Sequence, residues 1–232
     1  MMARNLRMLP VGKSLNPSSE KQKGTGCPFV ISSWGMDKKE AMRAIRDQVI
    51  TVGGELMAER VRNGTFPVLG EGSHEARILF VGEAPGKNEA ETGRPFCGAA
   101  GRVLDELIAS LGLKREDVYI TNVVKDRPPN NRDPRPEEIE LYAPFLDHQI
   151  DVIRPKVIAT LGRFSMDYVM RRYGLEHQVE SISRIHGKVF KTQMEWGSMY
   201  VVPLFHPAVA LYRASQKAEL LEDAKVLLGC LV

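Results

Sequence analysis

The chain has 232 residues, 43% of them hydrophobic and 26% charged, which is enough to bury the core of one α/β domain. No run approaches the roughly 18 apolar residues of a membrane span, and the N-terminal residues lack the apolar centre of a signal peptide. We therefore expect a cytoplasmic protein without a membrane segment. The three cysteines, Cys27, Cys97 and Cys230, form no CxxC pair, which argues against a disulfide framework or a zinc knuckle.

The net charge of +3 arises at the N-terminus. Within residues 1–25 five cations face one carboxylate, Glu20, so this stretch carries +4 and the remainder about −1. Overall charge is therefore weak evidence for nucleic acid, because that argument needs a local basic face. Residues 1–36 mix Lys, Ser, Gly and Pro without a sustained period, and we expect a basic, mostly disordered arm before a domain over 37–232.

After the arm, helices and strands are predicted to alternate. Apolar residues at helical spacing predict two helices over 37–63, interrupted at Gly53-Gly54. The apolar run 77–82 is short and bounded by turn residues, as expected of a buried parallel strand. Further strands are expected at 118–124, 156–161, 189–190 and 199–204, and helices at 104–111, 135–153, 163–173 and 217–228. This pattern is typical of an α/β fold with a doubly wound, mainly parallel sheet and helices on both faces.

Three predicted strand ends carry polar side chains. Glu83 follows the first strand, Asn122 lies in the second, and His206 follows the last. Taken singly, these residues could be a surface carboxylate, a turn former and a loop histidine. Ligands of doubly wound sheets bind beyond the carboxyl ends of the strands, so we expect the three side chains to line one crevice.

The motifs that contain these residues resemble those of the family 4 uracil-DNA glycosylases. The resemblance extends from about Glu55 to the C-terminus. One motif would be weak evidence, but five in the same order argue against accident. The motifs are Gly82–Gly86 followed by Glu89 and Gly93–Phe96, then Tyr119–Lys125, Arg127–Arg132, Gly187–Val189 and Leu204–Ala208. The resemblance implies the glycosylase fold and a monomeric DNA-repair enzyme that hydrolyses the N-glycosidic bond of uracil in DNA, leaving an abasic site.

The chain departs from that family at its iron–sulfur ligands. The family holds a [4Fe–4S] cluster with four cysteines, whereas this chain has Asp126 and Tyr142 at the third and fourth positions. The first two positions fall near Glu55 and Ala58. Because such a cluster needs thiolate ligands, we expect no metal and no cofactor. The helix and loop that the cluster would hold together in that family must then be held by packing.

The expected chemistry has two ends. Breaking an N-glycosidic bond puts negative charge on the base and positive charge on the sugar. His206 is the candidate donor to the base, and Glu83, with Glu89 second, is the candidate carboxylate for the sugar side. His186 could act as a nucleophile or an electrostatic catalyst, but its position favours a strand lead-in. No suitably placed lysine suggests Schiff-base chemistry, so a monofunctional hydrolase is expected.

A flipped base needs an aromatic face and a hydrogen-bonding edge. Phe96 is the candidate face and Asn122 the candidate edge, with Gly82 and Ala84 beside them. An amide can donate to uracil O4 and accept from N3–H, but the same amide turned over fits cytosine. The preferred base therefore stays open at this point.

Binding to DNA also needs phosphate contacts and a wedge that fills the vacated stack. Arg127, Arg132 and Arg213 are candidates for the phosphates, and Leu211 or Val209 for the wedge.

Two other functions remain open. One is a glycosylase for a modified cytosine or a deaminated purine, for example in defence against foreign DNA. It is suggested by Cys97, by Ala90 and by a loop over 209–212 that is one residue longer than usual in the family. The other is a catalytically idle DNA-binding module, but the presence of Glu83, Asn122 and His206 argues against it.

Overall fold

The computed structural model describes residues 37–232. The predicted arm and Cys27 lie outside the described residues, so the arm and its boundary stay a prediction. The strands are β1 (Glu71–Gly72), β2 (Ile78–Gly82), β3 (Tyr119–Asn122), β4 (Val157–Leu161), β5 (Phe190–Met194) and β6 (Gly197–Leu204). The helices are α1 (Lys38–Ile50), α2 (Gly54–Asn63), α3 (Lys87–Thr92), α4 (Ala99–Ser110), α5 (Pro136–Ile153), α6 (Arg163–Arg172), α7 (Ile182–Ile185), α8 (Ala214–Ala224) and α9 (Val226–Gly229).

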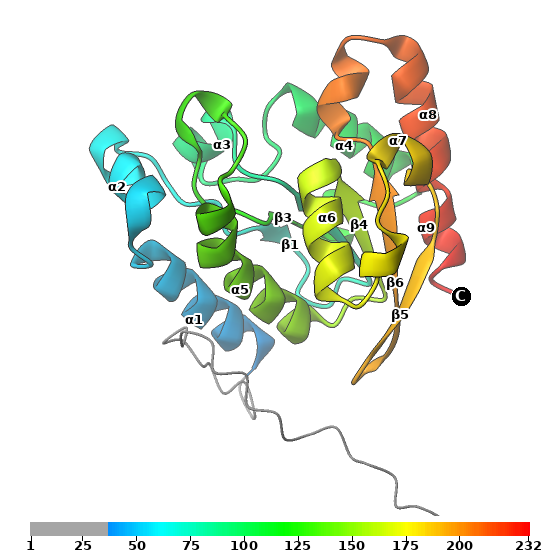
Figure 1. The fold of residues 1–232 in the computed structure, drawn as a ribbon, viewed down its shortest axis with the longest axis horizontal. Coiled ribbons are helices and arrows are strands. Elements are labelled where there is room, and N and C mark those ends of the chain that lie inside the picture. Colours follow the sequence, from blue (N-terminus) through cyan, green and yellow to red (C-terminus); the bar gives the residue numbers. More distant parts are fainter. Residues whose placement is uncertain (1–36) are drawn as a thin grey trace, which may run out of the picture. The chain divides into compact units, whose positions relative to one another are not determined.

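Within the described part the strands form one sheet in the order β1-β3-β2-β4-β6-β5 (Figure 1). The four inner strands are parallel, and β1 and β5 pair antiparallel at the two edges. The chain passes from β2 to β3 on one side, then returns through α5 to β4 on the other side of β2. This reversal places a crevice at the carboxyl ends of the inner strands, and the predicted doubly wound α/β fold is confirmed.

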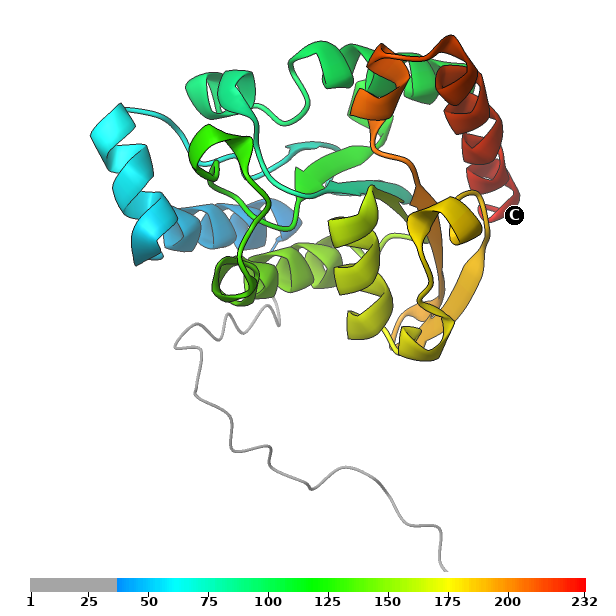
Figure 2. The same ribbon diagram turned by 45° about the horizontal axis from the view of Figure 1, so that its top comes forward.

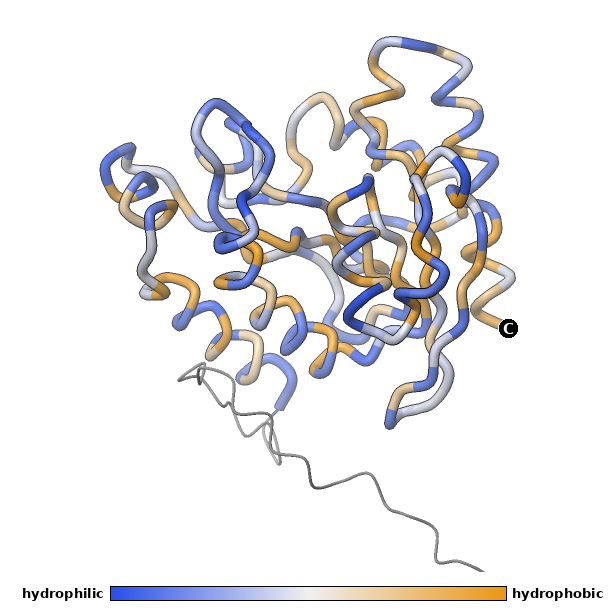
Figure 3. The backbone as a smooth tube through the Cα atoms, in the orientation of Figure 1, coloured by the Kyte–Doolittle hydropathy of each residue, from blue (hydrophilic) through white to orange (hydrophobic). Residues whose placement is uncertain are grey.

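The inner strands are apolar because both faces of the sheet are covered. Along β2, Leu79 and Val81 pack toward the layer of α1, α5 and α6, whereas Ile78 and Phe80 pack toward α4 and α8 (Figure 2). All four side chains are almost wholly buried. The helices that cover the sheet are amphipathic. In Figure 3, apolar and polar segments alternate along α1 and α5. Side chains that alternate between two buried faces explain the continuous apolar run.

Several predicted boundaries differ from the structure. The second inner strand ends at Asn122, not at residue 124. The expected helix at 104–111 begins at Ala99, and the last predicted helix is divided into α8 and α9. The short prediction at 189–190 is the edge strand β5, which forms a hairpin with β6 through a turn at Glu195 and Trp196. The unpredicted elements β1, α3 and α7 are six residues or fewer, too short for a period to reveal them.

The connection after β3 is held to α2 by a buried ion pair, not by packing alone as expected. Arg60 Nη1 lies 3.0 and 2.8 Å from the two Asp126 oxygens, and the Tyr142 hydroxyl donates to Asp126 Oδ2 at 2.6 Å. Arg60 also donates to the carbonyl of Ile50. The Arg60 and Asp126 side chains are 6% and 1% exposed. Two of the positions where the family has cysteines thus belong to a network that spans α2, this connection and α5.

Between residues 37 and 232, no helix has the length and apolar character needed to cross a membrane.

We expect Asp126→Asn to lower the free energy of unfolding by about 3–5 kcal/mol, because it leaves the Arg60 guanidinium buried without a counter-charge. The double variant Arg60→Met/Asp126→Asn should lose less than the two single variants together. Urea unfolding measures both effects. Arg62→Met is the matched control, since Arg62 lies on the same helix in an exposed pair with Glu59 and should change stability by less than about 1 kcal/mol. Single variants as stable as the wild type would contradict the prediction.

Candidate active site

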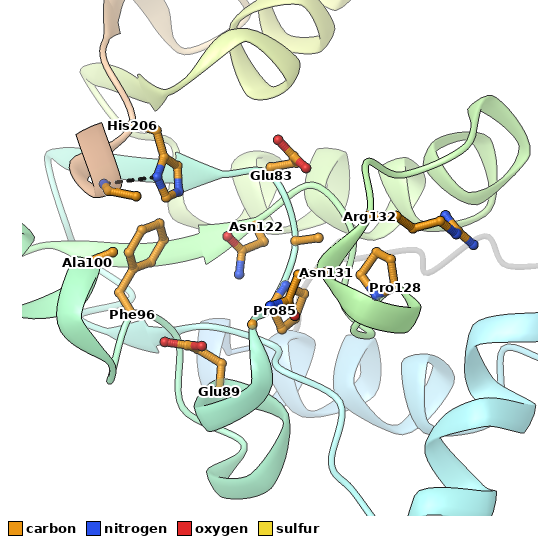
Figure 4. A pocket seen from close by; sticks show the side chains of 13 residues that line it. Glu83, Pro85, Glu89, Phe96, Ala100, Asn122, Pro128, Asn131, Arg132 and His206 are labelled. Atoms are coloured by element: carbon orange, nitrogen blue, oxygen red, sulfur yellow. Dashed lines mark hydrogen bonds between the residues drawn. The ribbon is translucent and has the colours of Figure 1, made fainter. Parts of the chain in front are cut away.

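A cavity of about 440 Å³ opens at the carboxyl ends of the inner strands (Figure 4). Its lining includes Glu83, Asn122 and His206, so the three predicted strand ends do meet in one crevice. Such a volume is within the range of small-molecule sites. The other lining residues are Ala84, Pro85, Gly86, Glu89, Phe96, Ala100, Pro128, Asn131, Arg132 and Ala208.

Asn122 reaches the cavity because Gly82 has no side chain. The two residues are register partners at the ends of β3 and β2. A Cβ on Gly82 would lie 2.2 Å from Asn122 Oδ1 and 2.7 Å from the Phe96 ring. Asn122 is 2% exposed, and its Oδ1 is buried without a hydrogen-bond partner among the described residues. A buried acceptor without a partner is unfavourable, so the cavity presents an acceptor to an incoming N–H.

Phe96 forms the aromatic wall in a strained conformation. Its φ is 48°, a left-handed value that bulky residues rarely adopt outside functional sites. Its carbonyl packs onto α4 at Gly101, where a Cβ would lie 1.7 Å from the Phe96 oxygen. The Phe96 ring centre lies 5.8 Å from that of His206.

Glu89 holds the segment that follows Phe96. Its Oε1 accepts the backbone N–H groups of Cys97 and Gly98, both at 3.0 Å. The carboxylate thus lines the cavity while one of its oxygens is engaged in fixing the loop.

His206 presents a defined hydrogen-bond donor. Its Nδ1 accepts the backbone N–H of Ala208 at 3.2 Å, so the proton of the neutral ring lies on Nε2. Burial lowers the pKa of His206, although the charge of Glu89 opposes the shift. The neutral form, with Nε2–H as donor, is therefore favoured.

Glu83 titrates near neutrality. Burial, and then the charge of Asp133, raise the pKa of Glu83 to about 7, while Arg163 opposes the shift. Asp133 is paired with Arg163. Burial therefore has the largest effect on the ionisation of Glu83, and the two members of the Asp133–Arg163 ion pair, which the sequence did not reveal, act on it in opposite directions.

The predicted DNA-binding residues are dispersed. Arg132 lines the cavity, but its guanidinium is paired with Glu138 at the start of α5. Arg127 donates to Asn131 and lines a separate hollow on the far side of the Pro128–Arg132 loop. Leu211 and Arg213 are exposed and lie outside the cavity wall.

His186 takes no part in the cavity. It is the C-cap of the short helix α7 and begins the connection that leads to β5. Its Nδ1 lies 2.6 Å from Asp223 Oδ2, and its ring stacks on Phe205 at 4.3 Å. These contacts give it a structural place between α7 and α8.

Several lining residues were not predicted as site residues. Pro128 and Asn131 line the cavity and lie in the Arg127–Arg132 motif. The resemblance of that motif to the glycosylase family could have identified them as site residues. Ala100 and Ala208 carry no chemical signal, because each contributes only a small apolar surface.

The cavity residues lie inside a segment shared with known enzymes. The profile of the Uracil DNA glycosylase superfamily matches residues 69–225. The chain belongs to the uracil-DNA glycosylase superfamily. A type-4 uracil-DNA glycosylase of Archaeoglobus fulgidus is 50% identical over 159 residues, which cover 68% of this chain and 78% of the relative. Proteins of the same name are 49% identical over 162 residues in Sulfurisphaera tokodaii, covering 69% and 73%, and 42% identical over 181 residues in Thermotoga maritima, covering 73% and 90%. The resemblance inferred from the motifs is confirmed.

The residues of this superfamily member do not fit a [4Fe–4S] cluster. Asp126 is engaged by Arg60, and Tyr142 donates to Asp126. Glu55 pairs with Arg135, and Ala58 is exposed on α2. In the described part of the chain, no group of three or more His, Cys, Asp or Glu side chains is placed to hold a metal ion.

We expect the purified protein to be colourless, because three cysteines cannot supply four thiolates and the cluster positions hold none. Absorbance spectroscopy and iron analysis test this. A brown protein with stoichiometric iron would overturn it.

Proposed function

We propose that this protein hydrolyses the N-glycosidic bond of uracil in DNA, releasing the base and leaving an abasic site. The observation that carries the proposal is the Asn122 Oδ1, buried and without a partner among the described residues, in a cavity that also holds the Phe96 ring and the His206 donor. The relatives named type-4 uracil-DNA glycosylase support the choice of uracil. The partner of the protein is then DNA. We still predict that the protein is a monomer.

The base enters the cavity only after it leaves the DNA stack. Its face lies on Phe96, and its Watson–Crick edge meets Asn122, which accepts from N3–H and donates to O4. A base that matches Asn122 poorly leaves buried polar groups unpaired, which disfavours its excision.

The leaving base is stabilised by His206. As the bond breaks, negative charge gathers on the base, and the Nε2–H of the neutral ring donates to it. A preorganised donor of this kind contributes about 2.7–4 kcal/mol.

Glu83 serves the sugar side. Its carboxylate stabilises the cationic sugar or positions the attacking water. We assign Glu89 to positioning Phe96, because Glu89 Oε1 holds the next two backbone N–H groups.

The DNA backbone is bound at the cavity and around it. Arg127, Arg132 and Arg213 contact phosphates, and Leu211 fills the vacated stack. The exposed positions of Arg213 and Leu211 leave them accessible for this.

Two of the three features that suggested another base, Ala90 and Cys97, lie outside the cavity wall. Ala90 is 2% exposed inside α3, and neither it nor Cys97 lines the cavity. No observation therefore favours a modified cytosine or a purine over uracil.

Replacing His206 should slow the chemical step. We expect His206→Ala to reduce the single-turnover rate of uracil excision about 10²–10³-fold with little change in DNA affinity, because the donor acts on charge that develops in the transition state. Alkaline cleavage of a duplex with one uracil, sized on a gel, measures the rate. An equal loss of affinity and rate would assign His206 to binding instead.

Replacing Asn122 should alter recognition. Asn122→Asp keeps an acceptor for N3–H but loses the donor to O4, so uracil excision should fall about 10–100-fold. Excision of cytosine should rise relative to uracil, since a carboxylate accepts from the cytosine amino group. Duplexes with uracil, cytosine, hypoxanthine or 5-methylcytosine are compared. A wild type that ignores uracil and removes another of these bases would contradict the proposed function.

The rate should depend on the ionisation of Glu83. Because the pKa of Glu83 is about 7 and the carboxylate is the active form, single-turnover excision should rise with pH through about 7 and then level off. Glu83→Gln should be slow and should lose this dependence.

The folded protein binds the Glu83 proton more tightly than the unfolded chain does, so Glu83 reduces stability as pH rises toward 7. Above that pH, Glu83→Gln should unfold at a higher urea concentration than wild type.

A further inference from the structure

A fully buried lysine lies beneath the cavity and has no part in the proposed chemistry. Lys125 is 0% exposed and follows Asn122 by three residues. Its Nζ lies 2.7 Å from the Asn122 carbonyl oxygen, 2.8 Å from Thr121 Oγ1 and 2.6 Å from Gln149 Oε1. Lys125 is not part of the cavity wall.

All three neighbours of Lys125 Nζ act as acceptors. The Asn122 carbonyl can only accept. The Thr121 hydroxyl donates its proton to the Leu69 carbonyl at 2.7 Å. Gln149 Nε2 donates to the same carbonyl at 2.8 Å, which turns Gln149 Oε1 toward the lysine.

Three acceptors require three N–H groups, which only the ammonium form of Lys125 supplies. Burial lowers the pKa of Lys125, and the charge of Asp147 opposes the shift. Although this burial lowers the pKa well below its usual value, the three acceptors around Nζ match the three N–H groups of an ammonium, one of which is bonded to the backbone of Asn122.

The Asn122 side chain depends on its backbone for its direction. Its Oδ1 has no partner among the described residues. On one side, the strand end is held by the Val123 N–H, which donates to the Gly82 carbonyl at 3.0 Å. Lys125 holds the Asn122 carbonyl itself.

We propose that Lys125 is a positioning residue for base recognition, which holds the end of β3 so that the Asn122 amide presents its acceptor to N3–H of uracil. This rests on the proposed function. It also gives Lys125 a task other than that of a nucleophile, since all three of its N–H groups are engaged.

A double-mutant cycle tests the proposal. Lys125→Met keeps most of the side-chain length but removes the donors, and we expect it to slow single-turnover uracil excision about tenfold or more, at a temperature where circular dichroism shows every variant folded. In the Asn122→Ala background the same change should have almost no further effect, because Lys125 acts through Asn122. A loss of the same size in both backgrounds would overturn the proposal, as would a wild-type rate for Lys125→Met.

Gln149→Leu is the matched control. It removes an acceptor from the same network but leaves the bond from Lys125 to Asn122. It should therefore destabilise the fold while slowing excision less than Lys125→Met does. If Lys125→Met does not fold, Lys125→Gln replaces it in the cycle. Because its amide keeps a donor, the loss of rate should be smaller than for Lys125→Met, but it should again disappear in the Asn122→Ala background, and a loss that persists there would overturn the proposal.

A second readout needs no activity. The ¹H–¹⁵N signals of the Asn122 side-chain NH₂ group can be assigned by their loss in Asn122→Ala. They should be one sharp pair in the wild type and should broaden or divide when Lys125 is replaced. Unchanged signals would overturn the positioning role. If the signals change when Lys125 is replaced but the wild type excises no uracil, the proposed function alone is contradicted.

Discussion

The cavity depends on the close approach of two strand ends. Gly82 and Asn122 lie side by side in the parallel ladder, and the Asn122 amide and the Phe96 ring both occupy space that any side chain at Gly82 would fill. Phe96 keeps its place although its φ is unfavourable, because Glu89 holds the next two N–H groups and the lack of a side chain at Gly101 leaves room for the Phe96 carbonyl. Strain at one residue is thus balanced by contacts around it, as is usual at functional sites.

A buried ion pair occupies a region that the related family is expected to fasten with a metal cluster. Arg60 and Asp126 are 66 residues apart in sequence, yet they join α2 to the connection after β3. Charges withdrawn from water need partners in good geometry, and here two carboxylate oxygens face one guanidinium while Tyr142 donates a further hydrogen bond. This network of Arg60, Asp126 and Tyr142 contains neither iron nor sulfur.

Much of the fold and the outline of the site follow from local patterns. The buried strands have continuous apolar runs, and Glu83, Asn122 and His206 were identified because parallel strands bring their ends together. The partners of these residues were harder to find. Nothing near Glu83 in sequence indicates that Asp133 affects its ionisation, and Arg60 resembles any arginine on a helix surface. Such pairings depend on distances in space between residues far apart in the chain, which one sequence does not contain.

The order of two charged residues in the connection after β3 affects the register of that segment. Lys125 and Asp126 are neighbours, both buried, and of opposite charge. Lys125 faces three acceptors, whereas Asp126 faces a guanidinium and a hydroxyl donor. A slip of this segment by one residue in one direction would bring the Asp126 carboxylate against the three acceptors, and a slip in the other direction would bring the Lys125 side chain against Arg60. The order of these two charges therefore fixes the register of the segment, and with it the point at which β3 ends and its last side chain enters the cavity.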